Sequence, residues 1–279
     1  MRHSADPTTG FLHNLYEAYN TRRFIDSDPV QFLHRFDDPG DQEVVGLVAS
    51  GLAYGRVASI HASVEEFLRR VEYSPSQFAD GTSRSRKLRS LDGFRHRWTP
   101  ASDVVDLLEG VKRVRREKGC LQEAVMEHLR EEHLSVREAA SGFVRALAKD
   151  GASKNSLLAD PASGSACKRL FLFFRWLARK DEVDLGIWSR LPVSKLVVPV
   201  DVHMHRAGQA LGFTKRKQAD LKAAMEITRG FKRLNSDDPL RFDFALTRPG
   251  ILGSIDLRDV LGRGSGEIKR LAKVLPVLE

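Results

Sequence analysis

The sequence predicts an all-α fold. Apolar residues recur at helical spacing along most of the 279 residues. Only one segment, 196–200, has the run of β-branched residues that is typical of a strand, and we expect it to be an isolated extended segment. Strands and helices do not alternate, which argues against a parallel sheet, and the sequence has no internal repeat. We therefore expect two helical lobes with a cleft between them.

The length and composition indicate one globular domain. Hydrophobic residues make up 42% of the chain, and the sequence has no linker that would separate independent domains. We expect residues 1–279 to form a single domain, with a central lobe at 46–200 and a second lobe made of 1–45 and 201–279. No segment approaches the roughly 20 apolar residues of a membrane-spanning helix, and the N-terminus contains no apolar signal core. We expect a cytoplasmic protein that does not act at a membrane.

The elements of the first half follow from the positions of apolar residues. Asp28-Pro29 begins a helix whose apolar residues share one face. Residues 74–90 combine Pro, Gly and five Ser with basic residues, which predicts a loop. Apolar residues three and four positions apart predict further helices over 11–19, 42–52, 60–71, 103–118, 121–133 and 136–149.

The second half combines helices with irregular segments. Residues 150–163 are polar and predict a loop, while 181–200 contain Gly and Pro and predict irregular structure. Gly212 ends a predicted helix, and 250–266 are rich in Gly. The predicted helices are 168–179, 202–211, 220–234 and a short one at 242–246.

The charge and the cysteines limit the kinds of partner and cofactor. The net charge is +8, which suits a polyanionic partner because phosphate contacts release counterions. Cys120 and Cys167 are the two cysteines of the chain, so they cannot supply the four thiolates of a zinc or iron–sulfur site. We expect no metal and no organic cofactor.

One carboxylate stands at the start of a predicted helix. Pro199 disfavours helical backbone at Val198, and Asp201 then occupies the N-cap position of the helix at 202–211. The simpler interpretation is a helix cap. A capping carboxylate is also ionised, rigid and directed out of the helix end, which are the properties needed to stabilise a sugar cation or to activate a nucleophile. The two roles are compatible.

One lysine stands at the start of another helix. Lys168 lies in the first turn of the apolar helix at 168–179, directly after Gly164-Ser165-Ala166-Cys167. The helix dipole disfavours a cation at this position, and partial burial also favours the neutral, nucleophilic amine. The alternative is a lysine whose apolar stem packs on the protein and whose head group lies in water.

These two segments resemble the helix-hairpin-helix DNA glycosylase superfamily. Residues 199–204, Pro-Val-Asp-Val-His-Met, look like its aspartate motif, most closely that of 8-oxoguanine DNA glycosylases. Residues 164–168 are similar to the Gly-x-Gly-x-Lys end of its hairpin, with Ala166 in place of the second glycine. The resemblance implies that Lys168 attacks C1′ of the sugar to form a Schiff base and that Asp201 assists.

The chain departs from the superfamily pattern in two respects. Lys168 and Asp201 are 33 positions apart, which is longer than the usual spacing and resembles the archaeal 8-oxoguanine branch. Ala162-Ser163 stand where the hairpin has Leu-Pro, although backbone N–H groups at 164–166 can still contact phosphate. From residue 25 onward the chain also resembles an uncharacterised, mainly bacterial family of this superfamily, over 51–56, 167–170, 175–176, 183–188, 199–206 and 238–246.

The resemblance also implies contacts with DNA. Tyr54-Gly55-Arg56 fall where glycosylases fill the gap left by a flipped base, although an ordinary helix–loop turn fits equally well. The basic run 84–97 either contacts phosphates or is a solvated loop. The predicted DNA-binding residues are Gly164, Ser165, Ala166, His203, Arg206, Tyr54 and Arg56.

Three further residues are predicted to line a pocket for the base, namely Trp176, Asp243 and Phe244. For Trp176 and Phe244 the alternative is packing in the core. A metal site at His203 and His205 is disfavoured, because alternate residues on a helix point apart and a third ligand is not evident.

The sequence therefore predicts a DNA repair enzyme of base excision, a glycosylase with AP lyase activity. Its partner would be double-stranded DNA that contains an oxidised purine, with 8-oxoguanine favoured, and we expect a monomer in the bacterial nucleoid. Two alternatives remain. One is a monofunctional glycosylase, in which Asp201 activates water and Lys168 only contacts DNA. The other is a non-catalytic protein that binds DNA or DNA damage on the same fold.

Overall fold

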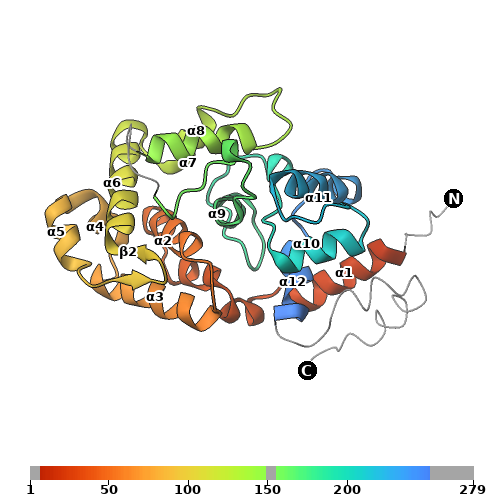
Figure 1. The fold of residues 1–279 in the computed structure, drawn as a ribbon, viewed down its shortest axis with the longest axis horizontal. Coiled ribbons are helices and arrows are strands. Elements are labelled where there is room, and N and C mark those ends of the chain that lie inside the picture. The colour runs from red at the N-terminus through yellow and green to blue at the C-terminus, as the bar shows by residue number, and fades with distance from the viewer. Residues whose placement is uncertain (1–6, 149–154, 252–279) are drawn as a thin grey trace.

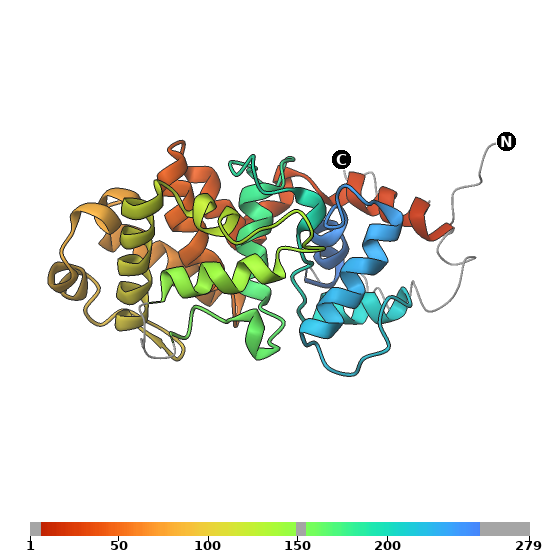
Figure 2. The ribbon, with the colours of Figure 1, turned by 90° about the horizontal axis from the view of Figure 1, so that it is seen from above.

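The structure, a computed structural model, describes residues 7–148 and 155–251. Within these residues it consists of helices and one two-stranded sheet, so the prediction of an all-α fold is confirmed. Figure 1 shows one group of helices on the left and another on the right, with α9 (Lys168–Ala178) seen end-on between them. Figure 2 shows the same order along the long axis. Across the two described ranges, no helix combines the length and the hydropathy needed to span a membrane.

The first group extends from residue 22 to residue 147. It begins with two 3-10 helices, η1 (Arg22–Ser27) and η2 (Pro29–Arg35), of which the second is the helix expected after Asp28-Pro29. The further elements are α2 (Pro39–Gly51), α3 (Val57–Arg70), α4 (Pro75–Gly81), α5 (Arg84–Ser90), β1 (Arg95–His96), β2 (Thr99–Pro100), α6 (Ala101–Lys118), α7 (Leu121–Met126) and α8 (Arg137–Leu147). The helix η2 packs on α2 and α3, and α6, α7 and α8 pack on one another.

The second group brings together segments from both ends of the described chain. It contains α1 (Pro7–Tyr19), α10 (Val202–Ala210), α11 (Leu221–Leu234) and α12 (Asp243–Ile251). The N-terminal helix α1 packs on α12, and α10 packs on both α11 and α12. Figure 1 accordingly shows the red helix α1 beside the blue helix α12.

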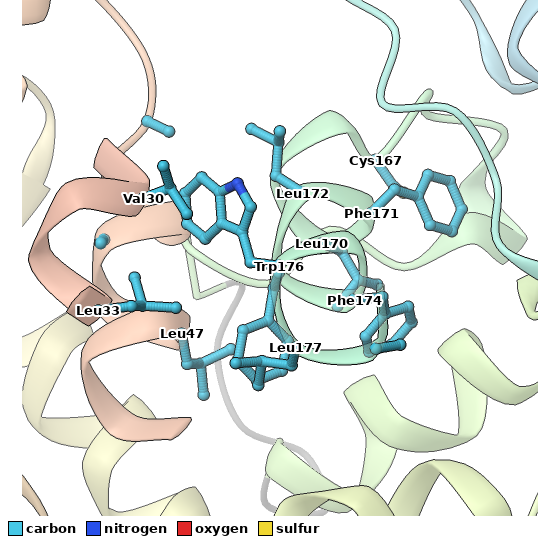
Figure 3. Close-up of a cluster of buried hydrophobic side chains, with 14 of the residues drawn as sticks. Val30, Leu33, Leu47, Cys167, Leu170, Phe171, Leu172, Phe174, Trp176 and Leu177 are labelled. Atoms are coloured by element: carbon cyan, nitrogen blue, oxygen red, sulfur yellow. The ribbon is translucent and has the colours of Figure 1, made fainter. Parts of the chain in front are cut away.

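The helix α9 lies at the centre of the hydrophobic core. Residues 170–178 are all buried, as expected for a helix that is apolar on nearly every side. It packs on α2, and Figure 3 shows the Trp176 ring directed from α9 toward Val30 of the η2 segment. The short 3-10 helices η3 (Pro161–Ser163) and η4 (Val193–Lys195) lie in the connections before and after α9.

The prediction of a loop at 74–90 is wrong, because this segment forms α4 and α5. Ser74 and Ser83 are the N-cap residues of the two helices, and Ser83 accepts a hydrogen bond from the backbone N–H of Arg86, whereas the other three serines lie within the helices. The Lys87 side chain is fully buried, and its ammonium donates to the Ala79 carbonyl and to Glu109, each at 2.6 Å. Packing against α6 therefore stabilises helices that local composition disfavours.

The strand prediction is incomplete. Residues 196–200 form neither a helix nor a sheet strand, Leu196 has extended backbone, and the buried Val198 N–H is satisfied by the Thr228 hydroxyl at 3.0 Å. The antiparallel hairpin β1–β2, which pairs Arg95 with Pro100 and His96 with Thr99, was not predicted. Two-residue strands are too short to produce a period-two pattern.

Several helix ends differ from the predicted ones. The helix α2 begins at Pro39, before the predicted start at residue 42, because the Asp38 carboxylate accepts a hydrogen bond from the Asp41 N–H at 2.9 Å. The helix α7 ends at Met126, well before residue 133. Parts of the predicted loop at 150–163 and of the Gly-rich segment at 250–266 lie outside the described residues.

Candidate functional site

The side chains of Lys168 and Asp201 meet where two helices begin. Lys168 is the first residue of α9, and Asp201 is the N-cap of α10. One carboxylate oxygen of Asp201, Oδ1, accepts hydrogen bonds from the backbone N–H groups of His203 and Met204, both at 2.9 Å. The other oxygen, Oδ2, lies 3.2 Å from Nζ of Lys168. The capping role and the contact with the amine therefore use different oxygens of one carboxylate.

Both side chains remain accessible to a ligand. The exposed fraction is 33% for the Lys168 side chain and 23% for that of Asp201. Burial by itself would raise the pKa of Asp201, but the Lys168 charge and the hydrogen bond from the Met204 N–H outweigh it and hold this pKa below its usual value. Asp201 is consequently ionised at neutral pH, as an electrostatic partner or a proton acceptor must be.

An open depression of about 490 Å³ lies beside Lys168. Its walls come from both groups of helices, because Ala53 and Tyr54 follow α2 whereas Gln218 and Ala219 precede α11. The remaining lining residues are Leu157, Ala159, Gly164, Ser165, Ala166, Cys167, Lys168, Arg169, Leu170 and Asp220.

The segment before Lys168 presents backbone to this depression. Gly164 has φ of 81°, in the left-handed region that glycine favours, and its carbonyl accepts a hydrogen bond from the Leu221 N–H at 3.1 Å. Gly164 and Ser165 are exposed and Ala166 is half-buried, so the predicted DNA-binding segment lies at the surface. Burial raises the pKa of the adjacent Cys167 thiol to about 11, which makes this cysteine a poor nucleophile.

Tyr54 lines the same depression and takes part in a stack that the sequence did not reveal. Its ring stacks on that of Trp98 with centroids 4.5 Å apart, and the Arg169 guanidinium lies 5.1 Å from its centroid. Trp98 is 58% exposed in the turn between β1 and β2. In the sequence, only the basic run 84–97, which ends just before Trp98, pointed to this surface. The spacing of residues does not show whether a single ring is exposed. Arg56 is exposed and is the N-cap of α3.

The residues predicted for a base pocket are buried. Trp176 has no exposed surface and lies in the core, which is the alternative that its sequence context left open (Figure 3). Asp243 pairs with the Arg175 guanidinium; burial raises the pKa of Asp243 to about 6 despite this cation. The Phe244 ring has the guanidinium of Arg175 at 5.8 Å and that of Arg248 at 4.3 Å from its centroid.

The remaining predicted residues lie on α10. His203 is half-buried, and Arg206 is exposed. His205 is buried, and its Nε2 atom has no hydrogen-bond partner in the described part of the chain. No group of three or more His, Cys, Asp and Glu side chains with the arrangement of a metal site occurs within 7–148 and 155–251.

A buried network of charges behind the site was not predicted. Arg175 donates to Asp184 at 3.0 Å and also contacts Asp243 of α12. Arg179, near the end of α9, pairs with Asp184 and with Asp238. The sequence contained one signal for this network: Arg175 interrupts an otherwise apolar helix. A charge that is buried in a core requires a partner of opposite charge, so this position predicts a buried ion pair.

One of three comparisons with known proteins, the scan against family models, matches most of the chain. The family model with the description "Protein of unknown function (DUF2400)" matches residues 28–252. No curated protein and no solved structure matches the chain. Because the matched segment covers most of the sequence, the protein belongs to the DUF2400 family.

Proposed function

We propose that the protein is a DNA glycosylase with AP lyase activity that removes an oxidised purine, with 8-oxoguanine the favoured lesion. One observation carries the proposal: Nζ of Lys168 lies 3.2 Å from Oδ2 of Asp201. The amine and the acid come from the starts of two helices, and Lys168 lines an open depression. An amine nucleophile that is held next to a fixed, ionised carboxylate is the arrangement that Schiff-base chemistry on a sugar requires.

The proposed reaction begins with proton transfer. The Lys168 ammonium gives a proton to Oδ2 of Asp201, and the freed nitrogen then bonds to C1′ of the damaged nucleotide. The bond from C1′ to the base breaks with its electron pair on the base, which takes up the proton that Asp201 returns. The Asp201 carboxylate also stabilises the positive charge that develops on the sugar.

Strand cleavage follows from the covalent intermediate. The nitrogen loses its second proton, the sugar ring opens with the electron pair of the C1′–O4′ bond on O4′, and O4′ is protonated. The resulting Schiff base makes the C2′ hydrogen acidic, and its removal expels the 3′ phosphate by β-elimination. Every step uses Lys168, Asp201 and water.

The surroundings of the pair are consistent with a duplex partner. Exposed arginines lie in both groups of helices, with Arg56 at the start of α3 and Arg206 on α10. Backbone N–H groups of Ser165 and Ala166 lie beside Lys168, at a helix start of the kind that binds phosphate, whereas the Gly164 N–H donates to the Pro161 carbonyl at 3.0 Å. The net charge of +8 supplies long-range attraction to DNA.

Borohydride trapping tests the proposal. Reduction of a Schiff base leaves a stable cross-link between protein and DNA, so duplexes that each contain one of several oxidised bases are incubated with each variant and borohydride. We expect cross-links with the wild type and none with Lys168→Gln. Lys217→Gln is the matched control, because it removes an exposed lysine next to a lining residue of the depression and should cross-link normally.

The products distinguish the alternatives. Release of a base without strand cleavage, at a rate unaffected by Lys168→Gln, would indicate a monofunctional glycosylase in which Asp201 activates water. DNA binding without release of any base across the panel would indicate a non-catalytic protein and would refute the proposal. Because general acid–base assistance contributes about 10²–10⁴-fold, Asp201→Asn should slow trapping by roughly that factor.

A further inference from the structure

Trp98 differs from the other tryptophans of the chain. Trp176 and Trp188 are buried, with exposed fractions of 0% and 2%, whereas Trp98 is 58% exposed. It lies in the turn between β1 and β2, next to Arg97, whose φ of 54° is in the left-handed region. The tight turn of the hairpin therefore presents a large aromatic ring to solvent.

The ring stands on a rigid base. Trp98 stacks on Tyr54 at 4.5 Å with an interplanar angle of 24°. The Tyr54 hydroxyl lies 2.8 Å from the His96 carbonyl, to which it donates, and 2.7 Å from the Thr99 hydroxyl. Both residues that hold Tyr54 belong to the hairpin that carries Trp98, so the two rings are fixed relative to each other.

The Tyr54 ring of the stack also contacts α9, the helix that begins with Lys168. Arg169 follows Lys168 directly, and its guanidinium lies 5.1 Å from the Tyr54 centroid. That guanidinium donates to the carbonyls of Gly51 and Ser156, both at 2.7 Å, so its position is fixed. The column Arg169–Tyr54–Trp98 therefore leads from the residue next to Lys168 out to solvent.

Much of the Trp98 ring is open to solvent, since the residue is 58% exposed. The Arg97 guanidinium lies 5.0 Å from the Trp98 centroid and 6.0 Å from that of Tyr54. With the two rings 4.5 Å apart, these separations form an acute angle at the Trp98 centroid, so Arg97 lies to the side of the stacked pair and not in line with it. Tyr54 covers one face of the ring, and the solvent-exposed face is the one that a ligand can reach.

We propose that this open face of Trp98 stacks on an unpaired nucleobase of the DNA that is bound at Lys168, while Arg97 contacts the backbone next to it. The inference rests on the proposed function in one respect, that the partner is DNA. Beyond that function, it assigns to Trp98 the role of holding one base of the bound DNA unpaired. An aromatic face that lies near exposed arginines, Arg95 and Arg97, suits a ligand that combines planar rings with phosphates.

Tryptophan fluorescence tests this directly. Because Trp176 and Trp188 are buried, a change in emission on binding reports mainly on Trp98. The protein carries Lys168→Gln, so no chemistry occurs. The probes are two duplexes of equal length, one fully paired and one with a single unpaired thymine. We expect strong quenching with the unpaired thymine, weaker quenching with the paired duplex, and no change in a variant that also carries Trp98→Phe.

Binding measurements give the second readout. Trp98→Ala should weaken binding of the duplex with the unpaired thymine on the order of tenfold, because stacking on an aromatic side chain contributes about that much per base. Trp98→Phe keeps a stacking face and should retain most of the affinity. Tyr73→Ala is the control, because Tyr73 is an exposed aromatic residue, at 46%, that is not part of the Tyr54–Trp98 stack.

The outcomes separate this inference from the proposed function. Equal affinities of wild type and Trp98→Ala for the duplex with the unpaired thymine would overturn the stacking role, even if the enzyme released a damaged base normally. Conversely, Trp98-dependent binding in a protein that never releases a base would leave the stacking role intact and refute only the glycosylase. Absence of binding to either duplex would refute both.

Discussion

At the scale of single residues, the two oxygens of the Asp201 carboxylate make different contacts. Its Oδ1 atom caps α10, and its Oδ2 atom faces Lys168. The two backbone hydrogen bonds hold Oδ1 at the helix start and leave Oδ2 for the contact with the amine. This geometry agrees with the sequence-based expectation that capping and a second role are compatible.

The two roles can be separated by substitution. Asparagine caps helices about as well as aspartate, so Asp201→Asn should lower the free energy of unfolding by less than about 1 kcal/mol. Asp201→Ala loses the cap as well and should cost about 1 kcal/mol more. Both variants should lose most of the proposed activity. Urea unfolding and borohydride trapping measure the two effects; equal unfolding free energies for the two variants would contradict the capping role.

The lowered pKa of Asp201 predicts how its contribution to stability depends on pH. An acid whose pKa is lower in the folded state than its ordinary 3.8 stabilises the fold above that value, and this stabilisation is lost as pH falls through the folded pKa. The stability difference between wild type and Asp201→Asn should therefore be constant from neutral pH down to about pH 5 and shrink below it. Unfolding in urea at a series of pH values measures this difference.

Another carboxylate titrates in the opposite sense. Asp243 has a folded pKa raised to about 6, so stability from this group falls as pH rises toward 6. Because the negative charge of Asp201 is one cause of this raised pKa, the two contributions are separated by repeating the comparison in an Asp243→Asn background, where Asp243 no longer titrates. A difference that grew toward acidic pH would contradict the lowered pKa of Asp201.

At the scale of elements, α9 connects the site to the core. Its first residue is Lys168, and its buried Arg175 contacts Asp184 and Asp243. Since Asp243 begins α12, and α12 packs on α10, the ion pair helps to hold the helix that carries Asp201. The distance between amine and acid therefore depends on contacts well behind the site.

Removal of Arg175 should show this dependence. Arg175→Ala leaves buried carboxylates without their cation and should lower the free energy of unfolding by about 3–5 kcal/mol. The control is Arg84→Ala, which breaks a pair with Asp106 in which both side chains are about half exposed, and it should cost at most about 1 kcal/mol. Urea unfolding compares them. Similar losses for the two variants would show that the buried network contributes little.

At the scale of the whole molecule, the depression lies between the two groups of helices. Residues that follow α2 and residues that precede α11 form its walls, and α9 contributes Lys168 between them. The described structure thus places Lys168 where a ligand would contact both groups. The boundary between lobes at 45/46 and 200/201 stays a prediction.

The charge of the molecule predicts a strong dependence of DNA binding on salt. Each phosphate contact contributes about 1 to the slope of the logarithm of affinity against the logarithm of salt concentration. The double variant Arg56→Gln, Arg206→Gln should therefore reduce this slope by about 2. Arg130→Gln removes an exposed arginine outside the depression and should leave the slope unchanged. Fluorescence titrations at several salt concentrations measure it, and an unaltered slope in the double variant would exclude both arginines as phosphate contacts.

The sequence by itself determined most of the helices and the residues that begin α9 and α10. Apolar spacing, prolines and capping side chains act within a few positions along the chain, so their effects are visible without the fold. The same local signals failed at 74–90, where burial of Lys87 against α6 stabilises two short helices. They also failed for the hairpin, whose strands are too short to show a pattern.

Only the tertiary structure decided which of these residues meet. Contact between Lys168 and Asp201 depends on how α9 and α10 pack, and the exposure of Trp98 depends on the Tyr54 ring beneath it. A side chain's neighbours in space are set by residues far away in the sequence, through burial and ion pairing. The sequence therefore supplied the amine and the acid, and the packing of α9 between two groups of helices placed Nζ of Lys168 and Oδ2 of Asp201 3.2 Å apart.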